Sequence, residues 1–85
     1  MKNNLAKIIV GVDVSKDTLD IYITLINKHM RLKNSEIGFR RLIKELSLYD
    51  VQCVAFESTG GYEALMARAL EQSGYLNPIL KILAN

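Results

Sequence analysis

The sequence predicts one small α/β domain whose elements follow the order βββαβα around a mixed sheet. Three observations indicate this class. A nearly continuous run of β-branched residues over 7–14 is typical of a central strand. Apolar and polar residues then alternate over 19–26, which is typical of a half-buried strand. Apolar residues later recur at helical spacing. With 85 residues, the chain is too short for a complete multi-domain enzyme.

The first half of the sequence predicts an antiparallel three-stranded meander. Residues 7–14 (KIIVGVDV) are expected to be buried on both faces of the sheet, with Asp13 as the one interruption. In the second strand, one face carries Leu19, Ile21, Ile23 and Leu25. Asn27 and Lys28 predict a tight connection to a third strand over 29–33, in which Met30 and Leu32 point inward.

The second half predicts a helix, a strand and a second helix. The first helix places Phe39, Leu42, Ile43 and Leu46 on one face, with Asn34 and Ser35 as candidate N-caps. Residues 51–56 read as a buried strand that ends at Glu57 and a turn over 58–61. The apolar stripe of the second helix is Tyr62, Leu65, Met66, Ala69 and Leu70, and Gly74 is the expected C-cap. Residues 75–85 are compatible with a fifth strand after Pro78 or with a short helix.

Composition narrows the setting of the protein more than its activity. The chain is 49% apolar and 24% charged, and its formal charge of +2 does not by itself indicate a nucleic acid or a membrane. No apolar run approaches the roughly 20 residues of a spanning helix. Cys53 cannot form an internal disulfide, and Cys53 with His29 cannot complete a zinc site. We therefore expect a reducing, cytoplasmic location without membrane association.

Two acids stand at the ends of two predicted strands. A right-handed crossover would place strand 51–56 parallel to strand 7–14, so Asp13 and Glu57 would meet at one edge of the sheet. Paired carboxylates favour a hard cation such as Mg²⁺ or Mn²⁺, although two acids make only half of a two-metal site. Alternatively, Asp13 binds turn amides and Glu57 lies near the positive end of a helix. Asp17 and Asp20 are expected to be solvated.

Positive charge is concentrated in one segment of the chain. Between residues 28 and 44 a single acid, Glu36, accompanies six basic residues. These are Lys28, Arg31, Lys33, Arg40, Arg41 and Lys44. They predict a surface that contacts nucleic-acid phosphates. The alternative is a solvated helix face, with Lys28 and Lys33 protecting an edge strand from pairing.

Two motifs in order resemble a known family. Residues 11–20 (GVDVSKDTLD) are followed by Gly38-Phe39 at the start of a helix and then by residues 56–63 (FESTGGYE). Over about residues 7–75 the chain resembles the N-terminal domain of the DEDD transposases of the insertion-sequence 110 family, which includes the pilin-gene invertases.

The resemblance implies an RNase H-like fold of the Holliday-junction-resolvase type and Mg²⁺-dependent phosphodiester chemistry in DNA transposition or inversion. Asp13 matches the first of four metal-binding acids and Glu57 the second. The later two acids and a serine-bearing C-terminal domain have no counterpart here. The family also implies DNA and a structured guide RNA as partners, and a homo-oligomer of the full-length protein.

The chain departs from the family pattern after Gly74-Tyr75. Members usually place a full hydrophobic strand before the Asn-Pro pair, which here is Asn77-Pro78. We therefore expect a truncated domain, with the C-terminal part of the fold missing, that does not cleave or join DNA alone. Two other functions stay open: a non-catalytic DNA-binding or oligomerisation module, and an actin-like phosphate-binding domain. The second lacks the glycine-rich turn expected after the first acid.

Overall fold

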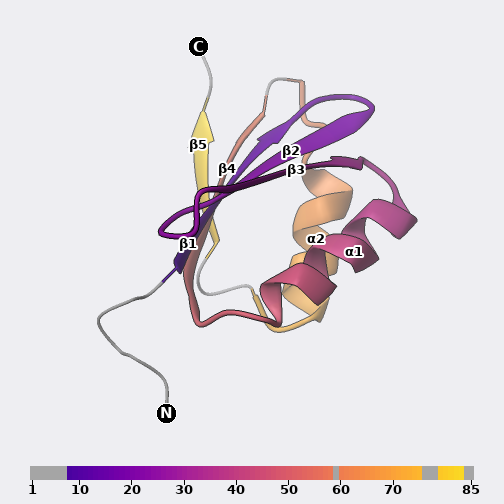
Figure 1. Ribbon diagram of the computed structural model, residues 1–85. Coiled ribbons are helices and arrows are strands. Elements are labelled where there is room, and N and C mark those ends of the chain that lie inside the picture. The colour runs from indigo at the N-terminus through magenta and orange to yellow at the C-terminus, as the bar shows by residue number, and fades with distance from the viewer. Residues whose placement is uncertain (1–7, 59, 76–78, 84–85) are drawn as a thin grey trace.

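The protein folds into a five-stranded sheet with two helices, as a computed structural model shows for residues 8–58, 60–75 and 79–83 (Figure 1). The elements are β1 (Ile8–Val14), β2 (Thr18–Ile23), β3 (Lys28–Lys33), α1 (Glu36–Leu46), β4 (Val51–Ser58), α2 (Ala64–Gln72) and β5 (Ile79–Leu83). No helix among the described residues has the length and apolar character needed to cross a membrane.

The sheet is mixed, with strand order β3-β2-β1-β4-β5. β1 pairs antiparallel with β2, and β2 with β3, which confirms the predicted meander. The crossover through α1 brings β4 back parallel to β1, and α2 leads in the same way to β5 beside β4. This arrangement confirms the α/β class and is consistent with the RNase H-like fold. It also decides in favour of a strand after Pro78 rather than a helix.

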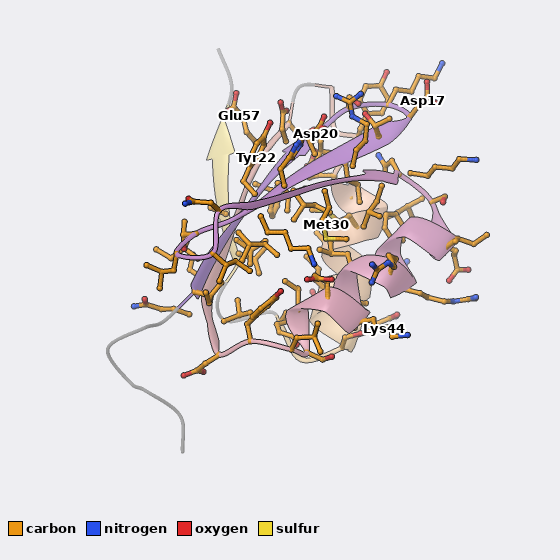
Figure 2. All side chains as sticks on the ribbon, in the orientation of Figure 1. Asp17, Asp20, Tyr22, Met30, Lys44 and Glu57 are labelled. Atoms are coloured by element: carbon orange, nitrogen blue, oxygen red, sulfur yellow. The ribbon has the colours of Figure 1, made fainter. Side chains whose placement is uncertain are left out.

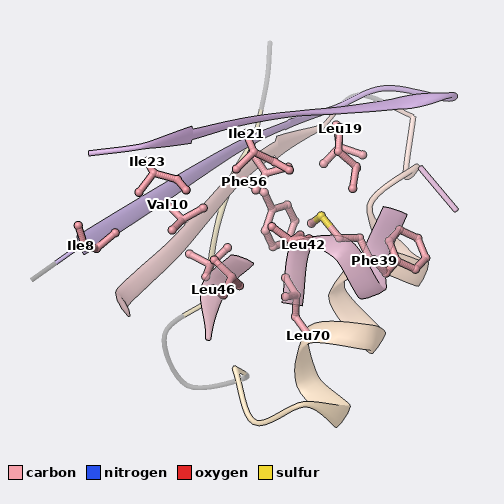
Figure 3. Packing of buried hydrophobic residues seen from close by; sticks show 14 residues of the cluster. Ile8, Val10, Leu19, Ile21, Ile23, Phe39, Leu42, Leu46, Phe56 and Leu70 are labelled. Atoms are coloured by element: carbon pink, nitrogen blue, oxygen red, sulfur yellow. The ribbon is translucent and has the colours of Figure 1, made fainter. Parts of the chain in front are cut away.

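Both helices pack on the same face of the sheet, and the hydrophobic core lies between the helices and the sheet (Figures 1 and 3). Buried side chains of alternate strand positions, such as Val10, Ile21 and Phe56, meet Leu42 of α1 and Leu70 of α2. The amphipathic helix pattern therefore identified the packing faces of α1 correctly. For α1, the expected N-cap is confirmed, because the Ser35 hydroxyl accepts a hydrogen bond from the Gly38 amide at 3.4 Å.

The prediction that β1 is buried on both faces was wrong. Burial alternates along the strand: Val10 and Val12 are buried, whereas Ile9 is 42% exposed and Asp13 is exposed. β4 alternates in the same way over its second half. Among the described residues, both helices cover one face only, so the second face of the sheet is open to solvent. We call it the open face.

The second strand is shorter than predicted. It ends at Ile23, and residues 24–27 form the turn to β3. Leu25, expected on the buried face, is 63% exposed and has a left-handed φ of 72°, and Asn27 has a φ of 51°. These two conformations turn the chain and end the alternation. The strand pattern could not reveal them because leucine seldom adopts positive φ.

The second helix also buries a narrower stripe than predicted. Met66 and Leu70 are fully buried, but Leu65 is 67% exposed and Tyr62, expected in the core, is 46% exposed. Tyr62 lies in the turn before α2, where Gly60 and Gly61 both have positive φ and direct the chain away from the sheet. The predicted C-cap is confirmed by the positive φ of Gly74.

Candidate metal and nucleic-acid site

The two acids predicted to meet are direct neighbours across parallel strands. Asp13 of β1 is the register partner of Glu57 of β4, and both are exposed on the open face. β4 extends to Ser58, two residues beyond the predicted end, so Glu57 is held within the strand rather than in the following turn. Figure 2 shows Glu57 projecting from the side of the sheet opposite the helices.

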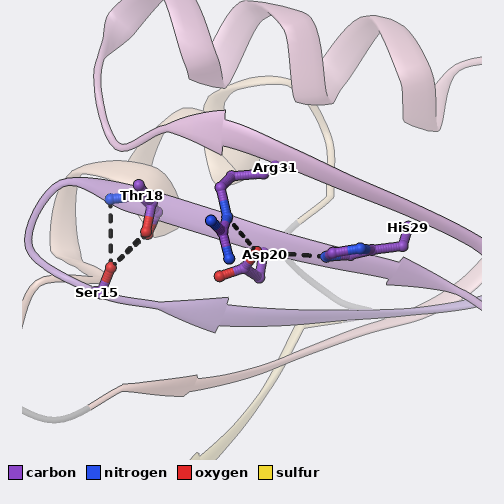
Figure 4. Close-up of polar contacts among 5 residues, drawn as sticks. All are labelled: Ser15, Thr18, Asp20, His29 and Arg31. Atoms are coloured by element: carbon purple, nitrogen blue, oxygen red, sulfur yellow. Dashed lines mark hydrogen bonds and ion pairs between the residues drawn. The ribbon is translucent and has the colours of Figure 1, made fainter.

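Ser15, and not Asp13, makes the side-chain hydrogen bond to an amide in the turn after β1. The turn after β1 is closed by Ser15, whose backbone amide donates to the Thr18 carbonyl. The Ser15 Oγ accepts a hydrogen bond from the Thr18 amide (Figure 4). Asn34 Nδ2 also donates to the Ser15 carbonyl at 2.9 Å. The turn thus has its own hydrogen bonds, and the carboxylate of Asp13 is exposed beside that of Glu57.

A third acid, Asp20, lies beside Asp13 on the open face of the sheet. Asp20 of β2 is the register partner of Asp13, and Arg31 of β3 is the partner of Asp20. Side chains at directly paired positions point to the same face of a sheet. Arg31, Asp20, Asp13 and Glu57 therefore form one row across four strands of the open face. We call it the acid row.

Asp20 is not the freely solvated acid that was expected. Its side chain is 18% exposed, and its Oδ1 accepts a hydrogen bond from Arg31 Nε at 2.8 Å and lies 3.3 Å from His29 Nε2 (Figure 4). The hydrogen bond from Arg31 has the largest effect and lowers the pKa of Asp20; partial burial opposes it, and the weaker contact with His29 lowers the pKa further. The Asp20 carboxylate is therefore already engaged with two neighbours.

A hollow of about 310 Å³ lies next to the acid row on the open face. Gly11 and Ala55, which are register partners, are among its lining residues, together with Asp13, Glu57 and Tyr22. The Tyr22 ring stacks on His29 with centroids 4.5 Å apart and an interplanar angle of 9°. Sequence reasoning missed this hollow. A glycine and an alanine in neighbouring strands, beside an outward-facing tyrosine, are the signal that could have revealed it.

The six basic residues are all exposed but lie on two sides of the molecule. Arg31 and Lys33 alternate with buried-side residues of β3 and thus belong to the open face, with the acid row. Lys28 lies on the helix side, where its Nζ is 2.8 Å from Glu45 Oε2. The other three basic residues belong to α1: Arg40, Arg41 and Lys44. Arg41 Nη1 lies 3.6 Å from Glu45 Oε1. The structure does not gather the six into one surface.

Two exposed carboxylates of the acid row, those of Asp13 and Glu57, lie on neighbouring strands. Exposed carboxylate oxygens are the ligands that Mg²⁺ and Mn²⁺ prefer, so Asp13 and Glu57 fit such a cation chemically. Within residues 8–58, 60–75 and 79–83, however, no group of three or more histidine, cysteine, aspartate or glutamate side chains is arranged to hold a metal. These residues can offer two carboxylate ligands from the open face.

The fold and the acid row define an α/β domain of the RNase H-like class. A model of the DEDD transposases of the insertion-sequence 110 family, described as transposase, matches residues 10–84. The chain therefore belongs to this transposase family, which confirms the resemblance seen in its two motifs. The family implies DNA as a partner and suggests a divalent metal.

Comparison with solved structures supports the fold alone. Nine chains match, and one is Pelota from Archaeoglobus fulgidus, with a TM-score of 0.68 and 11% sequence identity. The match covers 91% of this chain and 26% of the Pelota chain, so the present chain spans about a quarter of that protein. No curated protein matches the sequence significantly.

Proposed function

We propose that this chain is the metal-binding part of a transposase domain that acts on DNA strands. The observation that carries the proposal is the direct pairing of Asp13 and Glu57 across β1 and β4, on the exposed face of the sheet. Family membership supports it, because the matched range includes both acids, and the resemblance of the two motifs aligns them with the first two acids of the family. The match to residues 10–84 favours this function over an actin-like phosphate-binding domain.

Asp13 and Glu57 are the residues that would hold Mg²⁺ or Mn²⁺. When bound, such a cation polarises a phosphodiester and stabilises the charge on the attacking or leaving oxygen. Asp20 contributes less to cation binding, since Arg31 and His29 occupy its carboxylate. Asp20 is instead paired with Arg31, which keeps the net charge of the acid row closer to neutral. An anionic DNA strand can therefore approach Asp13 and Glu57.

Two carboxylates are fewer than the three or four that hold two metal ions. We therefore propose that the 85-residue chain does not cleave or join DNA alone, and that the later acids and the serine of the family act with it in the full-length protein. A structured guide RNA, and a homo-oligomer of that protein, are further proposals that rest on the family alone.

Metal binding is the direct test. Mn²⁺ added to the ¹⁵N-labelled chain should broaden amide signals around Asp13 and Glu57 before those of other acids, because a paramagnetic ion acts on nearby nuclei. The double variant Asp13→Asn/Glu57→Gln, which removes both charges without changing shape, should weaken Mn²⁺ binding at least about tenfold, or about 1.4 kcal/mol. Competition by Mg²⁺ should restore the signals.

Asp17→Asn provides the matched control. Asp17 is an exposed acid in the turn directly after β1, so its substitution changes the net charge without touching the acid row. This variant should keep the broadening at positions 13 and 57. Broadening that is absent from the wild-type chain, or equal in the double variant, would refute the metal site. DNA binding without any cation binding would instead support a non-catalytic DNA-binding module.

A further inference from the structure

We propose that the hollow beside the acid row binds one unpaired base of the DNA strand, which stacks on the free face of Tyr22. This inference rests on the proposed function and deepens it, because it names how the substrate strand is held. Tyr22 is 53% exposed and borders the hollow. Figure 2 places Tyr22 near Glu57, on the side of the sheet away from the helices.

The geometry around Tyr22 leaves one ring face available. Tyr22 pairs with His29 of β3 on one side and with Gly11 of β1 on the other. His29 covers the first ring face in a nearly parallel stack, at 4.5 Å and 9°. Gly11 has no side chain, so the β1 residue directly paired with Tyr22 places no atoms beyond its backbone beside the second ring face. Flat aromatic faces of this kind bind nucleobases, and each stacked base contributes about 1–3 kcal/mol.

The His29 side chain also makes the ring a rigid partner. His29 is within 3.3 Å of Asp20, which in turn accepts a hydrogen bond from Arg31. This chain of contacts fixes the imidazole under the tyrosine ring, and it links the aromatic pair to the acid row. A stacking surface that is held in place before binding loses less entropy when a base arrives.

The position of the hollow relative to the acids matches one nucleotide. Tyr22, Gly11 and Ala55 form the row that lies two residues along the strands from Asp20, Asp13 and Glu57. At about 3.3 Å per residue, the two rows are roughly 6.6 Å apart. A base on Tyr22 therefore leaves its own phosphate within reach of a cation on Asp13 and Glu57. The volume of about 310 Å³ accepts a single base with its sugar.

The experiment measures binding of a fluorescent hexathymidine strand to the full chain by anisotropy, in the presence of Mg²⁺. Tyr22→Leu should weaken binding by about tenfold, whereas Tyr22→Phe, which keeps the ring, should retain the wild-type affinity. The matched control is Tyr62→Leu, since Tyr62 is 46% exposed but does not line the hollow. Equal affinities of Tyr22→Leu and wild type would overturn the proposal.

A second variant tests the hollow without removing the tyrosine. An added Cβ at position 11 would meet only the Tyr22 carbonyl oxygen, at 4.0 Å, so Gly11→Val is expected to fold. Its side chain would fill the hollow and should weaken strand binding to the same extent as Tyr22→Leu. A probe with abasic sugars in place of thymidines should bind wild type as weakly as hexathymidine binds Gly11→Val. Full affinity for the abasic probe would overturn base stacking.

Mn²⁺ broadening of the variants separates this inference from the metal site. Tyr22→Leu and Gly11→Val should both keep Mn²⁺ broadening at Asp13 and Glu57, because neither removes a carboxylate. Loss of strand binding with intact Mn²⁺ binding supports the base site. Intact Mn²⁺ binding with unchanged strand binding refutes the base site alone, and absent Mn²⁺ binding in wild type refutes the proposed function. A dimer that forms without DNA and is abolished by Gly11→Val would assign the hollow to a second copy of the chain, against this proposal.

Discussion

Gly38 determines how closely α1 can approach the end of β3. A Cβ added at this position would lie 1.7 Å from the carbonyl oxygen of Lys33, which is backbone and cannot rotate away. Gly38 is in the first turn of α1, just after the Ser35 cap. The β3–α1 connection therefore requires a glycine at this position for steric reasons. At helix positions without such a close contact, glycine is less stable than alanine.

We predict that Gly38→Ala lowers the free energy of unfolding by about 1–3 kcal/mol, because the helix must move away from β3. Chemical denaturation followed by circular dichroism measures this change. Ile37→Ala is the control on the same helix: Ile37 is 76% exposed, so its effect should stay within about 0.5 kcal/mol. Equal stabilities of the two variants would show that α1 shifts without cost.

At the scale of elements, Glu45 joins α1 to the β2–β3 hairpin. Its side chain is only 2% exposed, and Oε2 accepts hydrogen bonds from Lys28 Nζ at 2.8 Å and from the Tyr49 hydroxyl at 2.7 Å. Lys28 and Tyr49 lower the pKa of Glu45 below its ordinary value of 4.5. In return, Glu45 raises the pKa of Lys28 and of Tyr49. A buried charge thus holds the helix to the edge strand.

The depressed pKa of Glu45 has a defined sign in the pH dependence of stability. Its contribution is complete above the unfolded-state pKa, near 4.5, and is lost as the pH falls through the lower folded-state pKa. Glu45→Gln should therefore lower the free energy of unfolding by about 1–3 kcal/mol at pH 7, and the difference from wild type should shrink below pH 4.5.

Denaturant titrations between pH 3 and 7 measure this difference. Glu36→Gln serves as the control, because Glu36 is on the same helix, is 81% exposed and is 4.0 Å from Arg40. Its effect should remain within about 0.5 kcal/mol at every pH. A gap between wild type and Glu45→Gln that stays constant down to pH 3 would contradict the role given to the Glu45 charge.

At the scale of the whole molecule, charge is divided between two sides. Arg31 and Lys33 belong to the open face, while Lys28, Arg40, Arg41 and Lys44 lie around α1. A DNA strand that reaches the acid row would run over the open face, so Arg31 and Lys33 should contact more of its phosphates than the four basic residues around α1. The six basic residues, which the sequence predicts to form one phosphate-contacting surface, are therefore expected to contribute unequally.

Two single lysine variants test the division. Lys33→Gln should lower the slope of log affinity for single-stranded DNA against log salt by about 0.7, the value for one lost phosphate contact. Lys44→Gln makes the same charge change on α1 and should lower the slope less. The same samples with Mg²⁺ should show no cleaved DNA. A larger change with Lys44, or cleavage that is abolished by Asp13→Ala, would contradict this account.

The pairing of Asp13 with Glu57 could be predicted because apolar patterns indicate the order of the elements, and the right-handed crossover rule then places the two strands side by side. The open face could not. An apolar run such as IIVGVDV is compatible with a strand buried on one face or on both faces. Which face is buried depends on where the helices pack, and the strand's own sequence does not contain this information. The contacts of Asp20 and Tyr22 could not be predicted for a related reason. Asp20 was expected to be solvated, but its partners Arg31 and His29 are on the next strand, and cross-strand partners follow only from an exact register.

That register also limits how the gene can change in length. One codon gained or lost within β1 or β4 ahead of its acid would rotate the carboxylate toward the packed helices, and two codons would shift it by a whole row. Length variation compatible with the acid pair is therefore confined to the connections, such as residues 24–27 and 47–50. Insertions there would leave both carboxylates aligned.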